Sequence, residues 1–302
     1  MTSIGVIGLG IMGSAMAGHL LRTGHRVVGY DVRTARARAL RASGGSAAKG
    51  CGDVGRQARI IITSLPSAEA LTQTVDDLRP VARPRQIVVE TSTLPLDVKV
   101  RARRRLRASG IELLDCPISG TGSQARDKDI VVYASGTRRG YDRVSTVLDA
   151  FTRAHYFVGP FGTGSKVKFV ANLLVAIHNV AAAEALVLAM KAGLDAGTVL
   201  ELITQGAGSS RVLQLRGPMM VKGDYRNATM TLATWQKDMA IIAEFARQVG
   251  SATPLFSATA PVYESARTMN ASHDTAAVCA VLERMAHHRR PARPHQPRAT
   301  RT

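Results

Sequence analysis

SIGVIGLGIMG, residues 3–13, decides the fold: a short apolar run passes directly into a glycine-rich turn, and a helical pattern follows. A strand, a Gly-x-Gly-x-x-Gly turn and a helix in this order are typical of a unit that binds a dinucleotide. Gly8 permits the sharp turn, Gly10 lets the backbone approach a pyrophosphate, and Gly13 lets the helix pack on the strand. The predicted cofactor site takes in the whole turn: Gly8, Leu9, Gly10, Ile11, Met12 and Gly13.

The next strand pattern, residues 26–30, ends at Asp31. An acid at the end of the second strand binds the adenosine ribose hydroxyls and repels a 2′-phosphate, so Asp31 joins the predicted cofactor site and favours NAD. Arg33, two residues later, has the charge to pair with a 2′-phosphate. We therefore expect NAD as the cofactor, with NADP as the alternative.

Strand and helix patterns alternate along the first half of the chain. Such alternation predicts a parallel sheet covered by helices. We expect an α/β Rossmann domain over residues 1–163, with a doubly wound, mostly parallel sheet. Its further strands are predicted at residues 59–64, 86–91, 111–114, 130–135 and 154–158, the last of which would close the sheet.

The pattern changes after residue 163. From Ser165 to Ala192 the chain is nearly all apolar, which predicts one long helix, and helical patterns continue to His287. We expect an all-α domain over residues 164–287, joined by this central helix, that serves the substrate and pairs subunits. A helix apolar on most sides needs a partner, which predicts a homodimer or homotetramer. Because polar residues interrupt every run long enough to span a bilayer, we expect no membrane span.

The last residues, 288–302, are rich in Pro and Arg and are predicted to be disordered. The net charge is +18, but only 4% of residues are aromatic and the arginines are spread over several segments. Stacking platforms for bases are therefore scarce, and we do not expect nucleic acid as a partner. The three cysteines lie far apart without metal-ligand spacing, and the start of the chain lacks the charged region of a signal peptide. We expect a cytoplasmic protein without a metal site.

A second glycine-rich stretch, GPFGTGSKVKFVAN at residues 159–172, leads into the long helix. Lys168 and Asn172 are four residues apart, so they lie on one face of that helix. Lys166 points to nearly the opposite side, which favours Lys168 as the functional lysine. The positive end of the helix and an apolar site would both favour the neutral form of Lys168.

Four ordered segments of the chain resemble segments of the β-hydroxyacid dehydrogenase family. They are GLGIMGSAMAGHL (8–20), DCPISGTGSQA (115–125), GPFGTGSKVKFVAN (159–172) and the Lys237–Asp238 pair in TWQKDMAIIAE (234–244). The family includes 3-hydroxyisobutyrate dehydrogenase, tartronate semialdehyde reductase and relatives of 6-phosphogluconate dehydrogenase. Many folds share one glycine turn, whereas four segments in the family's order are specific.

The resemblance implies roles for individual residues. Lys168 resembles the catalytic acid/base of the family, and Asn172 resembles the residue that holds the substrate beside it. The segment that holds the substrate carboxylate corresponds to Ser119, Gly120 and Thr121. The residues near the nicotinamide half of the cofactor correspond to Leu65, Pro66, Thr93 and Lys237. Thr121 departs from the family, which has a glycine at that position.

The implied reaction is hydride transfer between a nicotinamide cofactor and a small β-hydroxy acid, 3-hydroxyisobutyrate-like, or its semialdehyde. Two alternatives stay open. One is a reductase of imines or other carbonyl-like substrates on the same scaffold, which Lys168 and the Ser119–Gly120 pair argue against. The other is a non-catalytic dinucleotide-binding protein that docks on nucleic acid through its arginines.

Overall fold

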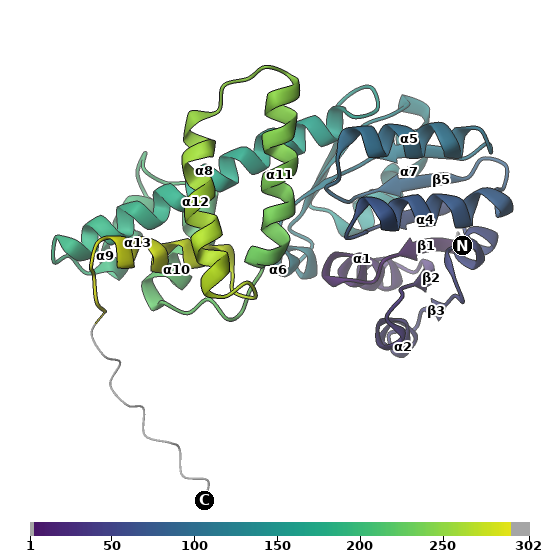
Figure 1. Ribbon diagram of the computed structural model, residues 1–302. Helices are drawn as coiled ribbons and strands as arrows, with labels where there is room; N and C mark the ends of the chain where they lie inside the picture. The colour runs from purple at the N-terminus through teal and green to yellow at the C-terminus, as the bar shows by residue number, and fades with distance from the viewer. Residues whose placement is uncertain (1–2, 291–302) are drawn as a thin grey trace, which may run out of the picture. The chain divides into compact units, whose positions relative to one another are not determined.

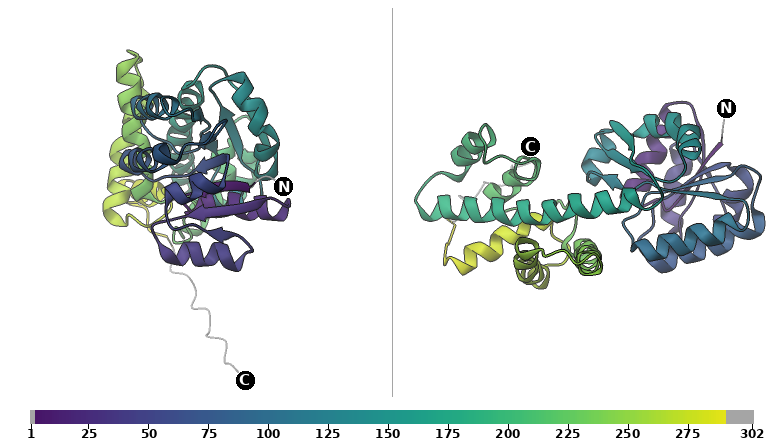
Figure 2. Two further views of the ribbon diagram at one scale, coloured as in Figure 1. Left: turned by 90° about the vertical axis from the view of Figure 1, so that its right-hand side faces the viewer. Right: turned by 90° about the horizontal axis from the view of Figure 1, so that it is seen from above.

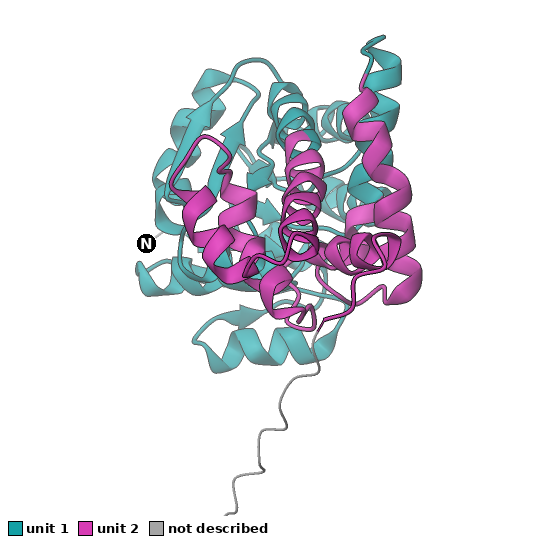
Figure 3. Ribbon diagram, turned by 90° about the vertical axis from the view of Figure 1, so that its left-hand side faces the viewer, with its two compact units in different colours: residues 1–173, 237–252 teal, residues 174–236, 253–302 magenta. Residues whose placement is uncertain are grey.

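The computed structural model of the protein describes residues 3–290, which form two compact units (Figure 3). Within these residues, unit 1 comprises 3–173 and 237–252, and unit 2 comprises 174–236 and 253–290. The sequence suggested a single division at 163/164. The compact units divide at 173/174, and residues 237–252 belong to unit 1, while the predicted domain boundary stays a prediction.

Six parallel strands form the main sheet of unit 1, in the order β3-β2-β1-β4-β5-β6. Figure 1 labels β1, β2, β3 and β5 of this sheet. They are β1 (Ser3–Ile7), β2 (Arg26–Tyr30), β3 (Ser46–Ala47), β4 (Ile60–Thr63), β5 (Ile87–Glu90) and β6 (Glu112–Asp115). The order reverses between β1 and β4, so the carboxyl ends of these strands mark the place where such sheets bind ligands. The predicted Rossmann sheet is confirmed; the two-residue β3 was not predicted.

Helices cover both faces of this sheet (Figure 2). One face packs against α1 (Ile11–Arg22) and α7 (Arg138–Phe151), and the other packs against α3 (Cys51–Gln57), α4 (Ala68–Leu78) and α5 (Leu96–Arg107). Successive residues of one strand point to opposite cores, as in β4, where neighbouring isoleucines belong to different clusters. Burial on both faces explains why these strands are continuous apolar runs.

Three further strands form a separate sheet in the order β7-β8-β9. They are β7 (Ile118–Ser119), β8 (Val131–Ala134) and β9 (Ala154–Phe157). The expectation that residues 154–158 close the main sheet was wrong, because β9 pairs in parallel with β8, and β8 pairs antiparallel with β7. A single bridge between Asp115 and Ser135 connects the end of β6 to this second sheet.

The remaining elements are helices, two of which cross the division between the units. Those two are α8 (Thr163–Lys191) and α11 (Leu232–Gln248), and the others in unit 2 are α9 (Ala196–Thr204), α10 (Arg211–Lys222), α12 (Pro254–Met269) and α13 (Val278–Met285). The predicted helix over 165–192 is confirmed as α8, and the helical character of the later chain is confirmed. Asn179, on α8, is fully buried and donates to the Tyr263 hydroxyl at 3.0 Å, so it is a core residue of unit 2.

The length and apolar composition of α8 bear on the prediction that the chain has no membrane span. Among the described helices, α8 alone is long and apolar enough to cross a membrane by length and composition. The central helix of a protein core has the same composition, and the absence of a membrane span stays a prediction.

Of the predicted disordered tail, residues 291–302 lie outside the described residues. Arg290, at its start, donates to Glu283 Oε1 at 2.7 Å and to the Val221 carbonyl at 2.6 Å.

Candidate active site

The glycine turn between β1 and α1 has the geometry of a phosphate cradle. A side chain at Gly8 (φ +89°) would lie 2.2 Å from the Ser64 carbonyl, and one at Gly13 would lie 1.8 Å from the Gly8 carbonyl. Gly10 faces open space, with the Arg36 guanidinium 3.8 Å away as its nearest neighbour. It begins α1 without a side-chain cap, and the first turn has no acidic residue. The free N–H groups and the helix dipole therefore suit a pyrophosphate at Gly10.

Asp31, after β2, is buried and fixed by three contacts. Its Oδ2 accepts a hydrogen bond from the Leu9 N–H at 2.8 Å, and its Oδ1 accepts one from the Arg33 N–H at 2.8 Å. The Arg36 guanidinium, from α2 (Thr34–Ala42), lies 3.1 Å from Oδ2. The carboxylate thus lies against the turn, as expected. The sequence analysis considered Arg33 as a partner for a 2′-phosphate and missed Arg36. The only sign of Arg36 in the sequence is a basic residue soon after Asp31, in the first turn of the following helix.

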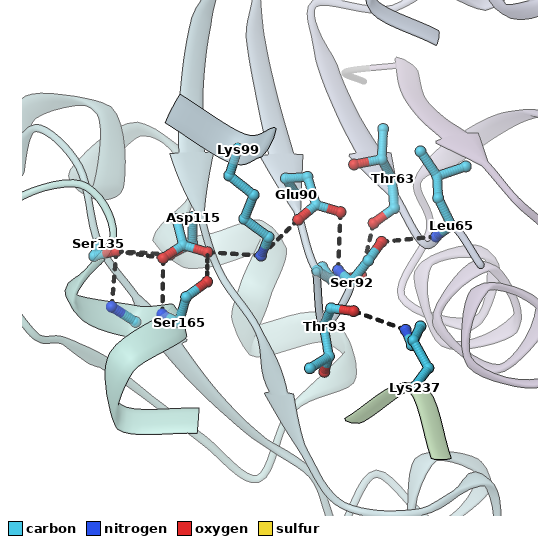
Figure 4. A network of polar contacts seen from close by, with 12 residues as sticks. Thr63, Leu65, Glu90, Ser92, Thr93, Lys99, Asp115, Ser135, Ser165 and Lys237 are labelled. Atoms are coloured by element: carbon cyan, nitrogen blue, oxygen red, sulfur yellow. Dashed lines mark hydrogen bonds and ion pairs between the residues drawn. The ribbon is translucent and has the colours of Figure 1, made fainter. Parts of the chain in front are cut away.

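The ends of β4 and β5 bring together the residues expected near the nicotinamide (Figure 4). The Leu65 N–H donates to Ser92 Oγ at 2.8 Å, and Lys237 Nζ donates to the Thr93 carbonyl at 2.7 Å. Pro66 follows Leu65 directly in the loop after β4. Lys237 lies on α11, far from Thr93 in sequence, and its role at the cofactor stays a prediction from the resemblance. Ser92 was not predicted, although it directly precedes Thr93 in the loop after β5.

The segment expected to hold the substrate carboxylate runs from β7 into α6 (Gly122–Arg126). Gly120 has φ +138°, and a side chain there would lie 2.7 Å from Ile130. The Thr121 N–H donates to Gln124 Oε1 at 3.0 Å, and the Thr121 hydroxyl contacts Ser123 Oγ at 2.9 Å. The Gln124 side chain therefore occupies the Thr121 N–H, which is not free to bind an anion in this conformation.

The first turns of α8 carry the predicted lysine and asparagine into a buried cluster with Asp238 of α11. Lys168 is 8% exposed, and Asn172 and Asp238 are each 4% exposed. Asn172 Nδ2 donates to Asp238 Oδ2 at 3.0 Å, and Lys237 Nζ lies 3.6 Å from Asp238 Oδ1. The i, i+4 prediction for Lys168 and Asn172 is consistent with this arrangement, and Lys166 is exposed. Sequence reasoning did not assign Asp238 a role.

Burial perturbs the two ionisable groups of this cluster in opposite senses. Burial lowers the pKa of Lys168 from 10.5 to about 8, and the charge of Asp238 opposes that shift. Burial raises the pKa of Asp238, while Lys237, Lys168 and the hydrogen bond from Asn172 oppose it. A lysine with a pKa near the working pH can both take and give a proton.

Other reactive residues take no part in a second site among the described residues. Cys51, Cys116 and Cys279 are free and buried, and burial raises the pKa of each thiol. They are therefore core residues, and their thiols are poorly suited to act as nucleophiles. Within residues 3–290, no group of three or more His, Cys, Asp or Glu side chains has the geometry to hold a metal ion.

Comparisons with known proteins extend this picture. The family described as the NAD binding domain of 6-phosphogluconate dehydrogenase matches residues 3–159. The one described as NAD-binding of NADP-dependent 3-hydroxyisobutyrate dehydrogenase matches residues 162–282. L-threonate dehydrogenase of Cupriavidus necator is 31% identical over 270 residues, which cover 88% of this chain and 91% of that protein.

Solved structures agree with the family matches. 3-Hydroxyisobutyrate dehydrogenase from Salmonella typhimurium has a TM-score of 0.85 and 28% identity, and the match covers 93% of this chain and all of that one. An imine reductase from Streptomyces aurantiacus has a TM-score of 0.64 at 21% identity over 93% of this chain and 99% of that chain, which shows a shared fold alone. Since the matches run through both halves of the sequence and include the segments that carry Lys168 and Lys237, the chain belongs to the β-hydroxyacid dehydrogenase family and is an NAD(P)-dependent hydroxyacid dehydrogenase of the 3-hydroxyisobutyrate dehydrogenase type.

Proposed function

We propose that the protein transfers hydride between a nicotinamide cofactor and a small β-hydroxy acid or its semialdehyde, with Lys168 as the general acid/base. The observation that carries this proposal is the burial of Lys168, whose pKa is lowered to about 8, in the same compact unit as the dinucleotide turn. The name of the Cupriavidus relative, an L-threonate dehydrogenase, supports a substrate with a carboxylate and a nearby hydroxyl.

The geometry divides the work among a few residues. With the pyrophosphate of the dinucleotide at the glycine turn, the nicotinamide would supply the acceptor or donor of the hydride. Neutral Lys168 takes the hydroxyl proton during oxidation, and charged Lys168 returns a proton during reduction. Asp238 orients Asn172 by accepting a hydrogen bond from its side-chain amide N–H. The amide oxygen of Asn172 is left for the substrate. Ser119 and Gly120 would hold the substrate carboxylate.

We further propose NAD as the preferred cofactor. The buried carboxylate of Asp31 lies at the position that binds ribose hydroxyls, and it repels a 2′-phosphate. Arg36 opposes this preference, because its guanidinium lies against the same carboxylate. The ratio of kcat/KM with NAD to kcat/KM with NADP measures the preference, and a ratio below one would contradict it.

A substrate panel tests the proposed reaction. Purified protein is assayed with threonate, 3-hydroxyisobutyrate, glycerate and their semialdehydes, and with a cyclic imine, by the absorbance of the reduced cofactor. Turnover of at least one acid, lost in Lys168→Ala while NADH binding is retained, is the expected result. Turnover of the imine alone would favour the imine reductase alternative, and near-normal turnover by Lys168→Ala would remove the lysine from the mechanism.

We also propose a homodimer or homotetramer in the cytoplasm. Three leucines of unit 2 are widely exposed for their type: Leu188 at 70%, Leu194 at 56% and Leu202 at 67%. Leu188 belongs to α8, and a helix that is apolar on most sides is typically covered by a partner. Three free cysteines suit a reducing compartment. Sedimentation of the parent and of Leu188→Glu tests the assembly, and a parent that sediments as a monomer would refute it.

A further inference from the structure

A buried group of charges in unit 1 has no part in the proposed reaction (Figure 4). Lys99, on α5, is fully buried, with Nζ 2.7 Å from Glu90 Oε2 and 2.8 Å from Asp115 Oδ1. The two carboxylates end neighbouring strands, β5 and β6, and face each other in register. Burial alone would lower the pKa of Lys99, but Asp115 and Glu90 raise it above its usual value, so the side chain stays charged.

The Asp115 carboxylate holds the start of α8. Its Oδ2 accepts a hydrogen bond from the Ser165 N–H at 2.8 Å, and its Oδ1 accepts one from Ser165 Oγ at 2.8 Å. Ser135 also connects Asp115 to the start of α8, because its hydroxyl donates to Asp115 Oδ2 at 3.1 Å and accepts from the Gly164 N–H at 3.0 Å. Ser165 lies one helical turn before Lys168, so this carboxylate fixes the base of the helix face that carries the catalytic lysine.

The Glu90 carboxylate holds the loop on the cofactor side. Its Oε1 accepts a hydrogen bond from the Ser92 N–H at 2.9 Å, and Ser92 Oγ in turn accepts one from the Leu65 N–H at 2.8 Å. Thr93 follows Ser92 and accepts a hydrogen bond from Lys237 through its carbonyl. The two carboxylates thus reach two different parts of the site, and Lys99 joins them.

We propose that Lys99 is a positioning residue, which sets the distance between the first turn of α8 with Lys168 and the loop that lines the cofactor. This inference rests on the proposed function for its kinetic consequence. An apolar side chain of similar volume would fill the same space without the desolvation of a charge. Such a side chain would not connect the hydrogen bonds of Glu90 with those of Asp115. For this reason we assign Lys99 a role in positioning the two segments.

A double-mutant cycle on the two branches tests the link. Ser92→Ala and Ser165→Ala each remove one hydroxyl at opposite ends of the chain of contacts. If Lys99 couples the ends, the effects of the two changes on kcat deviate from a simple product by at least about threefold, and this deviation disappears in the Lys99→Met background. Effects that multiply within about twofold in the parent protein would overturn the proposal.

Controls separate positioning from loss of stability. Arg216→Met removes a buried cation from Asp274 in unit 2, where the two groups lie 3.3 Å apart, and should leave the coupling between Ser92 and Ser165 intact. If Lys99→Met does not fold, Glu90→Gln takes its place, because it keeps the volume and weakens the ion pair. Coupling that persists in the folded Lys99→Met or Glu90→Gln background would also overturn the proposal.

A second readout needs no substrate. The pH dependence of Lys168 acetylation by acetic anhydride, followed by mass spectrometry, reports the pKa of this amine. In Lys99→Met a loosened first turn should hydrate Lys168 and raise that pKa from about 8 towards its usual value. If the parent turns over no hydroxy acid but the labelling shifts, the proposed function fails and the positioning role stands. If turnover is normal and the labelling does not shift, the positioning role fails alone.

Discussion

Lys168 combines two demands that oppose each other. A neutral amine near neutral pH requires burial, and burial of a charged amine destabilises the folded protein. Because the pKa of Lys168 is about 8 in the folded state and 10.5 in a free side chain, the unfolded state binds more protons between these values. Stability contributed by this site therefore rises as the pH increases from about 8 to 10.5, and the penalty is fully present at pH 7 and below.

Lys168→Met is expected to abolish turnover and to make the protein more stable. At pH 7 the free energy of unfolding should rise by up to about 3 kcal/mol, since a charged group leaves an apolar site. Urea unfolding at pH 7 and again above pH 10 measures the change, and the gain should shrink at the higher pH. A variant that is less stable than the parent at pH 7 would contradict this account of the site.

Asp238→Asn should shift the pH profile of oxidation in a defined direction. The charge of Asp238 raises the pKa of Lys168, so its removal lets the pKa fall below about 8. Oxidation requires the neutral amine, and its rising limb in kcat against pH should therefore move to lower pH. Glu244→Gln, which alters an exposed carboxylate on the same helix, serves as the matched control and should leave the limb in place. A shift to higher pH would show that Asp238 acts in another way.

At the residue scale, the sequence predicted those site residues that follow from helical or strand spacing or from a family resemblance. Lys168 and Asn172 follow from the helical repeat, and Asp31 follows from the strand that precedes it. Arg36 and the partners of Lys99 were missed, because such contacts join segments whose meeting depends on the tertiary fold. The use of the Thr121 N–H was also missed, because the change from glycine to threonine was read for its side chain and the acceptor is Gln124, three residues later.

At the scale of elements, the turn between β1 and α1 requires glycine at two positions for different reasons, packing at Gly13 and ligand binding at Gly10. Gly13 has no room for a side chain, because α1 approaches the Gly8 carbonyl closely. Gly10 has room on the protein side and an unstrained φ of −66°, so its open face is needed by the ligand. The same motif thus contains one position required for packing and one required for binding.

Gly10→Ala should therefore fold normally and bind the cofactor poorly. We expect the dissociation constant for NADH to rise by about tenfold or more, or about 1.4 kcal/mol, with little change in the melting temperature. Gly13→Ala is the contrasting variant, because overpacking at that position should lower stability by about 1–3 kcal/mol. Fluorescence titration and thermal unfolding measure the two quantities, and equal loss of stability in both variants would refute the distinction.

The main strands were predicted to within one or two residues, because each is an apolar run bounded by turn residues. The two shortest, β3 and β7, are two residues long and leave no periodic pattern in the sequence. The separation of the second sheet was missed for another reason. Pairing between β8 and β9 is set by the path of the chain after Asp115, and strand patterns do not record which sheet a strand joins.

At the scale of the whole molecule, unit 1 is assembled from two separate stretches of sequence. The segment 237–252, which begins within α11, carries Lys237 and Asp238 of the proposed site, and its Phe245 packs against Phe169, with ring centroids 5.2 Å apart. A linear division near residue 163 could not anticipate this return, because apolar periodicity shows that a helix is buried but not which core buries it.

A fragment of residues 1–173 should therefore be incomplete. We expect it to expose Phe169, to bind a dye that reports apolar surface and to unfold with low cooperativity. A fusion that joins residues 237–252 to the fragment through a flexible linker should restore a cooperative transition. Calorimetry of both proteins measures the difference, and a fragment that is as stable as the fusion would show that the returning segment contributes little.

The interrupted path of unit 1 also has a consequence for its synthesis on the ribosome. Lys168 emerges well before Asp238, and the helices of residues 174–236 must be made in the interval. At translation rates of about 5–20 residues per second, the nascent chain spends several seconds with a sheet and glycine turn but without the carboxylate that completes the site. The glycine turn is therefore synthesised before the segment that carries Asp238, and the nascent chain can assemble the proposed site only in the last part of its elongation.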